Sequence, residues 1–312
     1  MKRALLATLG VMFLAANAFA AYPEKSVTLI VPYGAGGGTD VTARMLAVDL
    51  EKQLGKSVVV ENLGGGAGWI GWGKLAASKP DGYTIGYINV PNIYAGYLNP
   101  KMKRAESLNS FTLISNHVTD PCVWVVSAQS PYKSLKELIE AAQKAPGKFS
   151  LAAHGFGGDD HLAMMDIEKK TGTSFSVVHN KSTAESRSQL LGGHVDILGA
   201  NVSEVFRAHK KGELRVLGVM GEKRSEYLPD VPTFKEQGID AVWSVSRGIG
   251  TPAGLPEDIK QVLTDALFKA LTSPEHKEKA QNLGLSLDTA TGADYTKRLE
   301  ATEKAVKALM NW

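Results

Sequence analysis

Three consecutive glycines, Gly36 to Gly38, follow an apolar, β-branched run and come just before a helix-like segment. Backbone N–H groups in the first turn of a helix have no intrahelical partner and carry partial positive charge. Because glycines lack Cβ, they let a ligand approach the main chain closely. This stretch, with Thr39 as the expected N-cap and Asp40 in the first turn, predicts a site for a carboxylate or phosphate. The alternative is a tight strand-to-helix turn without a ligand.

A second glycine-rich loop, Gly155 to His161, repeats the order of strand, glycines and helix start. Two helix N-termini that face each other across a cleft suit a dianion, or a carboxylate with a polar tail. Asp40, Asp159 and Asp160, however, place negative charges where an anion would bind. For Asp40 and Asp160 we favour the ordinary role of a first-turn carboxylate, which accepts hydrogen bonds from loop amides. We expect Asp159 to face the cleft. If one of the three accepts from a ligand hydroxyl or ammonium, a hydroxy or amino acid is favoured over a plain dicarboxylate.

Further polar side chains follow predicted strands, at the sheet edge where α/β proteins bind ligands. Asn92 is a candidate ligand contact, with a turn role as the alternative. Asn180 and Asn201 end strands in the same way. Arg247 can pair with a ligand carboxylate in a bidentate manner. An equally favoured alternative is that Arg247 forms an interlobe salt bridge with Asp40, Asp159 or Asp160.

The sequence motifs give little support for an enzymatic function. The glycines match neither a P-loop nor Gly-x-Gly-x-x-Gly, and no Gly-x-Ser-x-Gly elbow is present. Asp159-Asp160-His161 is too compressed for the usual metal spacings, and Cys122, which follows Pro121, is poorly placed as a nucleophile. We therefore predict no catalytic residue, no metal and no cofactor. A secreted hydrolase that uses Asp159, Asp160 and His161 remains the alternative from another class.

The N-terminus has the pattern of a secretory signal peptide. Met1-Lys-Arg3 is basic, Ala4 to Ala16 is a short apolar run, and Ala18-Phe-Ala20 is a small-residue cleavage signal. This predicts residues 1–20 as the signal and a mature protein that begins at Ala21, exported to a bacterial periplasm. With a single cysteine, Cys122, no intrachain disulfide is expected.

The charge balance argues against nucleic acid as a partner. The formal net charge is +3, with 35 Lys and Arg against 32 Asp and Glu, and removal of Lys2 and Arg3 lowers it by two. A nucleic-acid-binding chain is normally far more basic.

The predicted elements alternate between strand and helix, which is typical of α/β domains with parallel sheets. A helical tail without strands must cover the first domain, so the chain is expected to return there through crossovers near 118–126 and 241–249. Two α/β lobes joined by two extended strands form a hinge with a cleft. We place lobe 1 at residues 21–121 and 244–312 and lobe 2 at 122–243. The predicted strands are 27–31, 57–61, 84–87, 123–126, 149–152, 176–179, 195–199, 214–220 and 241–249. The predicted helices are 40–54, 71–78, 134–145, 161–170, 183–191, 202–210, a short one from Thr233, 256–272, 274–283 and 292–310.

Motifs along the whole mature chain resemble the Bug-type substrate-binding receptors of tripartite tricarboxylate transporters. They include Val31-Pro-Tyr-Gly-Ala-Gly-Gly-Gly-Thr-Asp40, Val58-Val-Val-Glu-Asn62, Pro80-Asp-Gly-Tyr-Thr84, Leu190-Leu-Gly-Gly-His-Val-Asp196, Glu222-Lys-Arg-Ser225, Leu228-Pro-Asp-Val-Pro-Thr233 and Thr251-Pro-Ala-Gly254. The resemblance implies a two-lobed periplasmic binding protein of the type II-like Venus-flytrap kind. It also implies a small carboxylate ligand, which is a di- or tricarboxylate, a hydroxy or amino acid or an aromatic carboxylate, and transient contact with membrane transporter subunits.

The resemblance places the ligand loops at 33–40 and 154–162. Tyr33 stands where an aromatic residue is usual, whereas Gly158 occupies a place where a small hydroxyl residue is common. The expected ligand-binding residues are Tyr33, Ala35, Gly36, Gly37, Gly38, Thr39, Asp40, Asn92, Gly155, Gly157, Gly158, Asp159, Asp160, Asn180, Asn201 and Arg247. We expect a monomer, and a sensor subunit for a membrane kinase is the alternative binding role.

Overall fold

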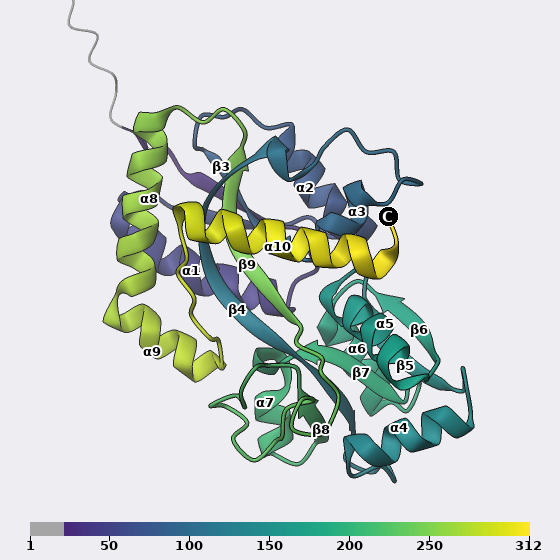
Figure 1. The fold of residues 1–312 in the computed structure, drawn as a ribbon. Coiled ribbons are helices and arrows are strands. Elements are labelled where there is room, and N and C mark those ends of the chain that lie inside the picture. Colours follow the sequence, from purple (N-terminus) through teal and green to yellow (C-terminus); the bar gives the residue numbers. More distant parts are fainter. Residues whose placement is uncertain (1–21) are drawn as a thin grey trace, which may run out of the picture.

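The computed structural model describes residues 22–312, apart from the side chains of residues 292 and 293. The predicted signal peptide and its cleavage site lie outside this range. The fold is mixed α/β with two lobes, whose strands join in one curled sheet of order β2-β1-β3-β9-β4-β7-β5-β6, with β8 paired to β4 (Figure 1). Within the described chain, no helix has the length and apolar character needed to cross a membrane.

Lobe 1 is built on three parallel strands, because β1 (Val27–Val31) pairs with β2 (Val58–Asn62) on one side and with β3 (Thr84–Val90) on the other. Its core is aliphatic and aromatic, and leucines of the C-terminal half such as Leu263 and Leu267 pack into it with Leu46. The chain therefore returns to lobe 1 after completing lobe 2. The other elements of lobe 1 are α1 (Gly38–Leu54), η1 (Gly66–Gly68), α2 (Trp69–Ala76), α3 (Tyr94–Leu98), η2 (Leu108–Ser110), α8 (Glu257–Thr272), α9 (Pro274–Leu283) and α10 (Gly292–Met310).

Lobe 2 repeats the parallel arrangement, with β5 (Phe149–His154) between β6 (Phe175–Asn180) and β7 (Ile197–Asn201). Two buried apolar clusters fill its two faces, one around Trp124 and Phe234 and the other around Val125 and Leu198. The remaining elements are α4 (Leu135–Lys144), α5 (Asp159–Thr171), α6 (Thr183–Leu191), α7 (Val202–Lys210) and β8 (Leu214–Val219).

Two long strands connect the lobes. β4 (Phe111–Ser127) and β9 (Ser244–Pro252) pair in antiparallel fashion from Phe111 opposite Pro252 to Pro121 opposite Ser244, with two register shifts. β4 then continues into lobe 2, where it pairs with β7 and β8. In Figure 1 both strands run obliquely from one lobe to the other and pass behind α10.

A buried series of hydrogen bonds connects α9 with the other elements of lobe 1. The Tyr87 hydroxyl lies 2.8 Å from His117 Nδ1, His117 Nε2 lies 2.8 Å from His276 Nε2, and His276 Nδ1 lies 2.9 Å from Asp49 Oδ2. Lys279 donates to the other oxygen of Asp49 at 2.6 Å. The series thus links β3, β4, α9 and α1.

The predicted order of the longer helices and strands is confirmed, and three local predictions are wrong. Thr39 is not the N-cap of α1, because the helix begins at Gly38 with Gly37 as its cap, and the Thr39 hydroxyl accepts from Asn89 Nδ2 instead. Thr233 and Glu236 make the reciprocal bonds of a capping box, yet the chain forms only a turn there. β4 also begins well before the predicted strand. The predicted lobe boundaries stay a prediction.

Candidate functional site

The start of α1 faces lobe 2. The N–H of Gly38 donates to Glu204 Oε1 at 3.0 Å, and Glu204 Oε2 accepts from the N–H of Asn201 at 2.9 Å, which caps α7. A Cβ at position 38 would lie 2.5 Å from Arg247 Nη2 and 2.7 Å from Glu204 Oε1. A side chain at position 38 would therefore displace the Arg247 guanidinium and the Glu204 carboxylate from these positions.

An ion pair is buried where β4 and β9 leave lobe 1. Arg247 Nη1 donates to Asp120 Oδ2 at 2.8 Å, and Nη2 donates to Asn201 Oδ1 at 3.1 Å. Arg247 is 1% exposed and Asp120 is 0% exposed. Burial disfavours the charge of Arg247, but the neighbouring charges of Asp120 and Glu204 raise the pKa of the guanidinium above its usual range. The predicted alternative of a salt bridge to Asp40, Asp159 or Asp160 is replaced by a pair with Asp120.

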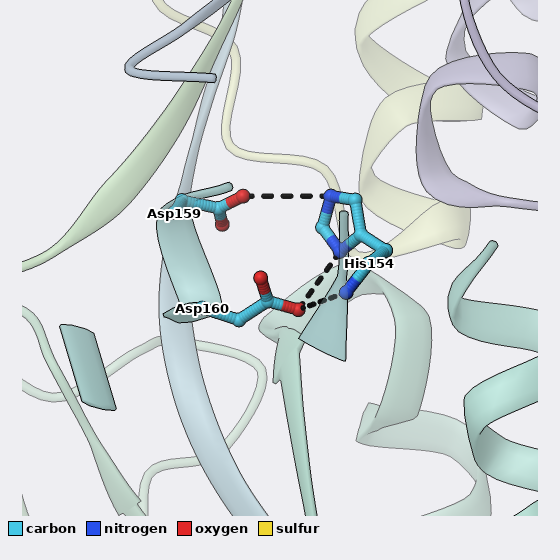
Figure 2. Close-up of side chains that lie close together, drawn as sticks. All are labelled: His154, Asp159 and Asp160. Atoms are coloured by element: carbon cyan, nitrogen blue, oxygen red, sulfur yellow. Dashed lines mark hydrogen bonds and ion pairs between the residues drawn. The ribbon is translucent and has the colours of Figure 1, made fainter. Parts of the chain in front are cut away.

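His154, the last residue of β5, lies between the carboxylates of Asp159 and Asp160 at the start of α5 (Figure 2). His154 Nδ1 lies 2.8 Å from Asp160 Oδ2, and Nε2 lies 3.5 Å from Asp159 Oδ1. Burial opposes protonation of His154, but the charges of Asp160 and Asp159 outweigh it and raise the pKa of His154 to about 10. The two carboxylates therefore favour the protonated form of the ring.

The same three residues have ligand atoms within 4.8 Å of one another, which is close enough for a metal ion. The two ring nitrogens of His154 nevertheless point to different carboxylates. An imidazole can offer only one nitrogen to an ion, so this arrangement fits a ring that is hydrogen-bonded to Asp160 and paired by charge with Asp159 better than a shared cation.

Asp159 is buried at the junction of the lobes. It accepts from Asn201 Nδ2 at 2.8 Å, from the Cys122 thiol at 3.2 Å and, across the cleft, from Asn92 Nδ2 at 3.2 Å. Burial raises the pKa of Asp159, but the His154 charge and these hydrogen bonds outweigh it and lower the pKa. Asp159 thus faces the opposite lobe as a fully bonded carboxylate.

Asp40 and Asp160 have local partners. Asp40 accepts from the N–H of Gly36 at 2.8 Å and also from Arg44 and Asn62. Asp160 accepts from the backbone N–H groups of His154 and His161. Both therefore do what a first-turn carboxylate is expected to do. The imidazole of His161 accepts from the N–H of Gly157, and among the described residues it makes no hydrogen bond to the side chain of Asp159 or Asp160.

A small cavity of about 20 Å³ lies between the lobes. Three buried polar atoms that belong to its lining residues have no hydrogen-bond partner, namely the Tyr33 hydroxyl, Asn89 Oδ1 and Arg247 Nε. The cavity is also lined by Gly37, Gly38, Thr39, His154, Ser182, Thr183, Asn201, Glu204 and Val245.

A larger cavity of about 430 Å³, which we call the chamber, opens beside it. Tyr33 and His154 line both cavities. The chamber is otherwise lined by Gly65, Gly66, Ala67, Gly68, Trp69, Ala95, Gly96, Met102, Gly155, Phe156, His179, Asn180 and Lys181.

Several predicted site residues lie apart from the small cavity. Asn180 bonds Ser186 and Gln189 within lobe 2, although it lines the chamber, and Ala35 is exposed. Gly157 and Gly158 are packed closely against neighbours: a Cβ at position 157 would lie 2.0 Å from Ala95 Cβ, and one at position 158 would lie 2.8 Å from the His154 carbonyl oxygen.

Glu204, His154 and Asp120 were not among the predicted ligand-binding residues. The Asn201-Val-Ser-Glu204 pattern after a strand signals a capping box, and this much was available from the sequence. The contact between Glu204 and Gly38, which lie 166 positions apart, could not be predicted from the sequence.

Comparisons with known proteins agree on one family. The family model described as "Tripartite tricarboxylate transporter family receptor" matches residues 42–311. A "UPF0065 protein in gbd 5'region" from Cupriavidus necator is 33% identical over 305 residues, 97% of this chain and 92% of that protein. The solved periplasmic binding protein BugD is 30% identical with a TM-score of 0.87, over 93% of this chain and 98% of that one. Rpa4515 of R. palustris, solved with adipate, is 26% identical with a TM-score of 0.85, over 92% of this chain and 98% of that one.

Proposed function

This chain belongs to the family of tripartite tricarboxylate transporter receptors, and we propose that it captures a small carboxylate between its lobes and presents the closed form to membrane transporter subunits. It is a periplasmic solute-binding receptor of the TctC and Bug type. We also propose that the protein is exported with cleavage of its signal peptide near Ala20, and that it is a monomer.

The observation that carries the proposal is the set of unpartnered buried atoms around the small cavity. Buried polar groups almost always find hydrogen-bond partners, and exceptions call for an explanation. The Tyr33 hydroxyl and Arg247 Nε are donors, whereas Asn89 Oδ1 is an acceptor. A carboxylate oxygen satisfies the donors, and a hydroxyl or ammonium next to it satisfies the acceptor.

The positions of these groups suit a ligand that holds the lobes together. Tyr33 and Asn89 come from lobe 1, Arg247 comes from a connecting strand, and Asn201 and Thr183 come from lobe 2. A ligand that touches both lobes is bound best in the closed form and shifts the population toward it. The adipate in the Rpa4515 structure supports a carboxylate as the ligand of this chain as well.

The test is a binding screen of the protein without residues 1–20 against a panel of carboxylates. A ligand that binds only the folded state raises the unfolding free energy by about 2.7 kcal/mol at one hundred times its Kd. We expect a rise in melting temperature with at least one carboxylate, followed by 1:1 binding in calorimetry. Absence of any shift across the panel would contradict the proposal.

A further inference from the structure

The chamber has walls from both lobes. Trp69 and Met102 come from lobe 1, and Phe156 and His179 come from lobe 2, while the glycines of the 65–68 segment add bare backbone. A volume of about 430 Å³ lies within the range of small-molecule sites. Phe156 is 44% exposed. An apolar occupant that spans the chamber would cover this ring and touch both lobes at once.

The charges around the chamber differ from those around the small cavity. None of the described residues that line the chamber is acidic, whereas Lys181 and His154 are basic. The small cavity contains Glu204, which already accepts from the Gly38 N–H at the start of α1. Arg247 lines the small cavity beside Glu204 and gives one ligand carboxylate a counter-charge there, whereas the mostly apolar walls of the chamber favour an apolar body over a second carboxylate.

The junction of the two cavities carries a donor for that single carboxylate. Tyr33 lines both cavities, and its buried hydroxyl has no partner. The Tyr33 ring meets the His154 ring edge-on, with centroids 5.7 Å apart. The polar end of a ligand can therefore lie at Tyr33 while its body extends between the aromatic side chains of the chamber.

We propose that the ligand is a monocarboxylate with a flat apolar body, such as an aryl carboxylate, bound with its carboxylate at Tyr33 and its ring in the chamber between Trp69 and Phe156. This rests on the proposed function, because it assumes a carboxylate in the cleft. It narrows the ligand class by excluding compact di- and tricarboxylates as the preferred ligands.

The test compares matched acids by calorimetry on the protein without residues 1–20. Phenylacetate and 4-hydroxybenzoate represent the aryl class, and succinate and malate represent the compact class. We expect the better aryl acid to bind at least about ten-fold more tightly than either compact acid, the scale of apolar discrimination by a pocket. Equal or tighter binding of a compact acid overturns the chamber assignment alone, whereas no binding by any carboxylate overturns the proposed function.

Two variants locate the binding site. Phe156→Ala removes a ring from the chamber wall and is expected to weaken the binding of aryl acids about five-fold or more. Phe268→Ala is the matched control, because it removes a ring that is 59% exposed on α8. Ala67→Leu adds bulk to the chamber at a position that already carries a Cβ and should also weaken aryl binding. Wild-type aryl affinity in both chamber variants would overturn the proposal.

Discussion

The carboxylate of Glu204 in lobe 2 accepts a hydrogen bond from the backbone N–H of Gly38 in lobe 1, at 3.0 Å. The carboxylate of Glu204 therefore binds the N-terminus of α1, where the sequence predicts an anion site. Since this bond needs no ligand, the closed arrangement has a stabilising contact of its own.

Glu204→Ala is expected to shift the ligand-free protein toward an open form. A hydrogen bond to a charged group contributes about 1.5 kcal/mol or more, which is about ten-fold in the ratio of closed to open protein. Small-angle X-ray scattering should show a larger radius of gyration. Glu185→Ala is the control, because Glu185 accepts from the Lys181 N–H at the start of α6, within lobe 2. An unchanged radius in the Glu204 variant would argue against the contact.

Gly38→Ala is expected to prevent full closure, since its Cβ would lie 2.5 Å from Arg247 Nη2. Alanine favours a helix, so the melting temperature should change little while the affinity for carboxylates falls at least about ten-fold. Gly73→Ala on α2 is the control, because no atom lies within 4 Å of the Cβ that it would add. Equal affinities of the two variants, measured by calorimetry, would contradict the expected clash.

Arg247→Met should destabilise the fold strongly by leaving Asp120 buried without its counter-ion. Removal of one partner from a buried pair costs about 3–5 kcal/mol. Urea unfolding measures the loss. The double variant Arg247→Met with Asp120→Asn should recover part of it, because no buried charge then stays unpaired. A single variant within about 1 kcal/mol of wild type would rule out a structural role for this pair.

His154 should make the protein less stable as the pH rises. The folded-state pKa of about 10 lies above the ordinary value of 6.5, so the folded protein binds the proton more tightly than the unfolded chain. The resulting stability is complete below pH 6.5 and is lost between pH 6.5 and 10. Urea unfolding at pH 7 and 9.5 should show a smaller loss in His154→Asn than in wild type. Parallel pH profiles would contradict protonation of His154.

His117 is expected to act in the opposite direction. Burial first, and then the charges of His276 and Arg247, lower the pKa of His117 well below 6.5. The unfolded chain therefore takes up the proton first, and stability falls as the pH drops below 6.5. His117→Gln should lose less stability than wild type between pH 6.5 and 5 in urea unfolding. A loss as large as in wild type would exclude His117 as its source.

The alternation of strands and helices was predictable because hydrophobic periodicity and capping signals are local. The polar contacts of the site depend on residues far apart in the sequence. Asp120 lies inside the crossover predicted near 118–126, but its partner Arg247 is 127 positions away, and no local pattern pairs the two residues. Thr39 has the residue type of an N-cap, but its hydroxyl bonds Asn89 instead, since a tertiary contact outweighs a local preference.

β4 and β9 are hydrogen-bonded to each other along most of the length of β9. Neither strand can twist or bend without the other, so the two connections deform as one ribbon, unlike two independent flexible linkers. We expect the lobes to move mainly along a single path, which would keep the surface offered to a partner the same at each closure.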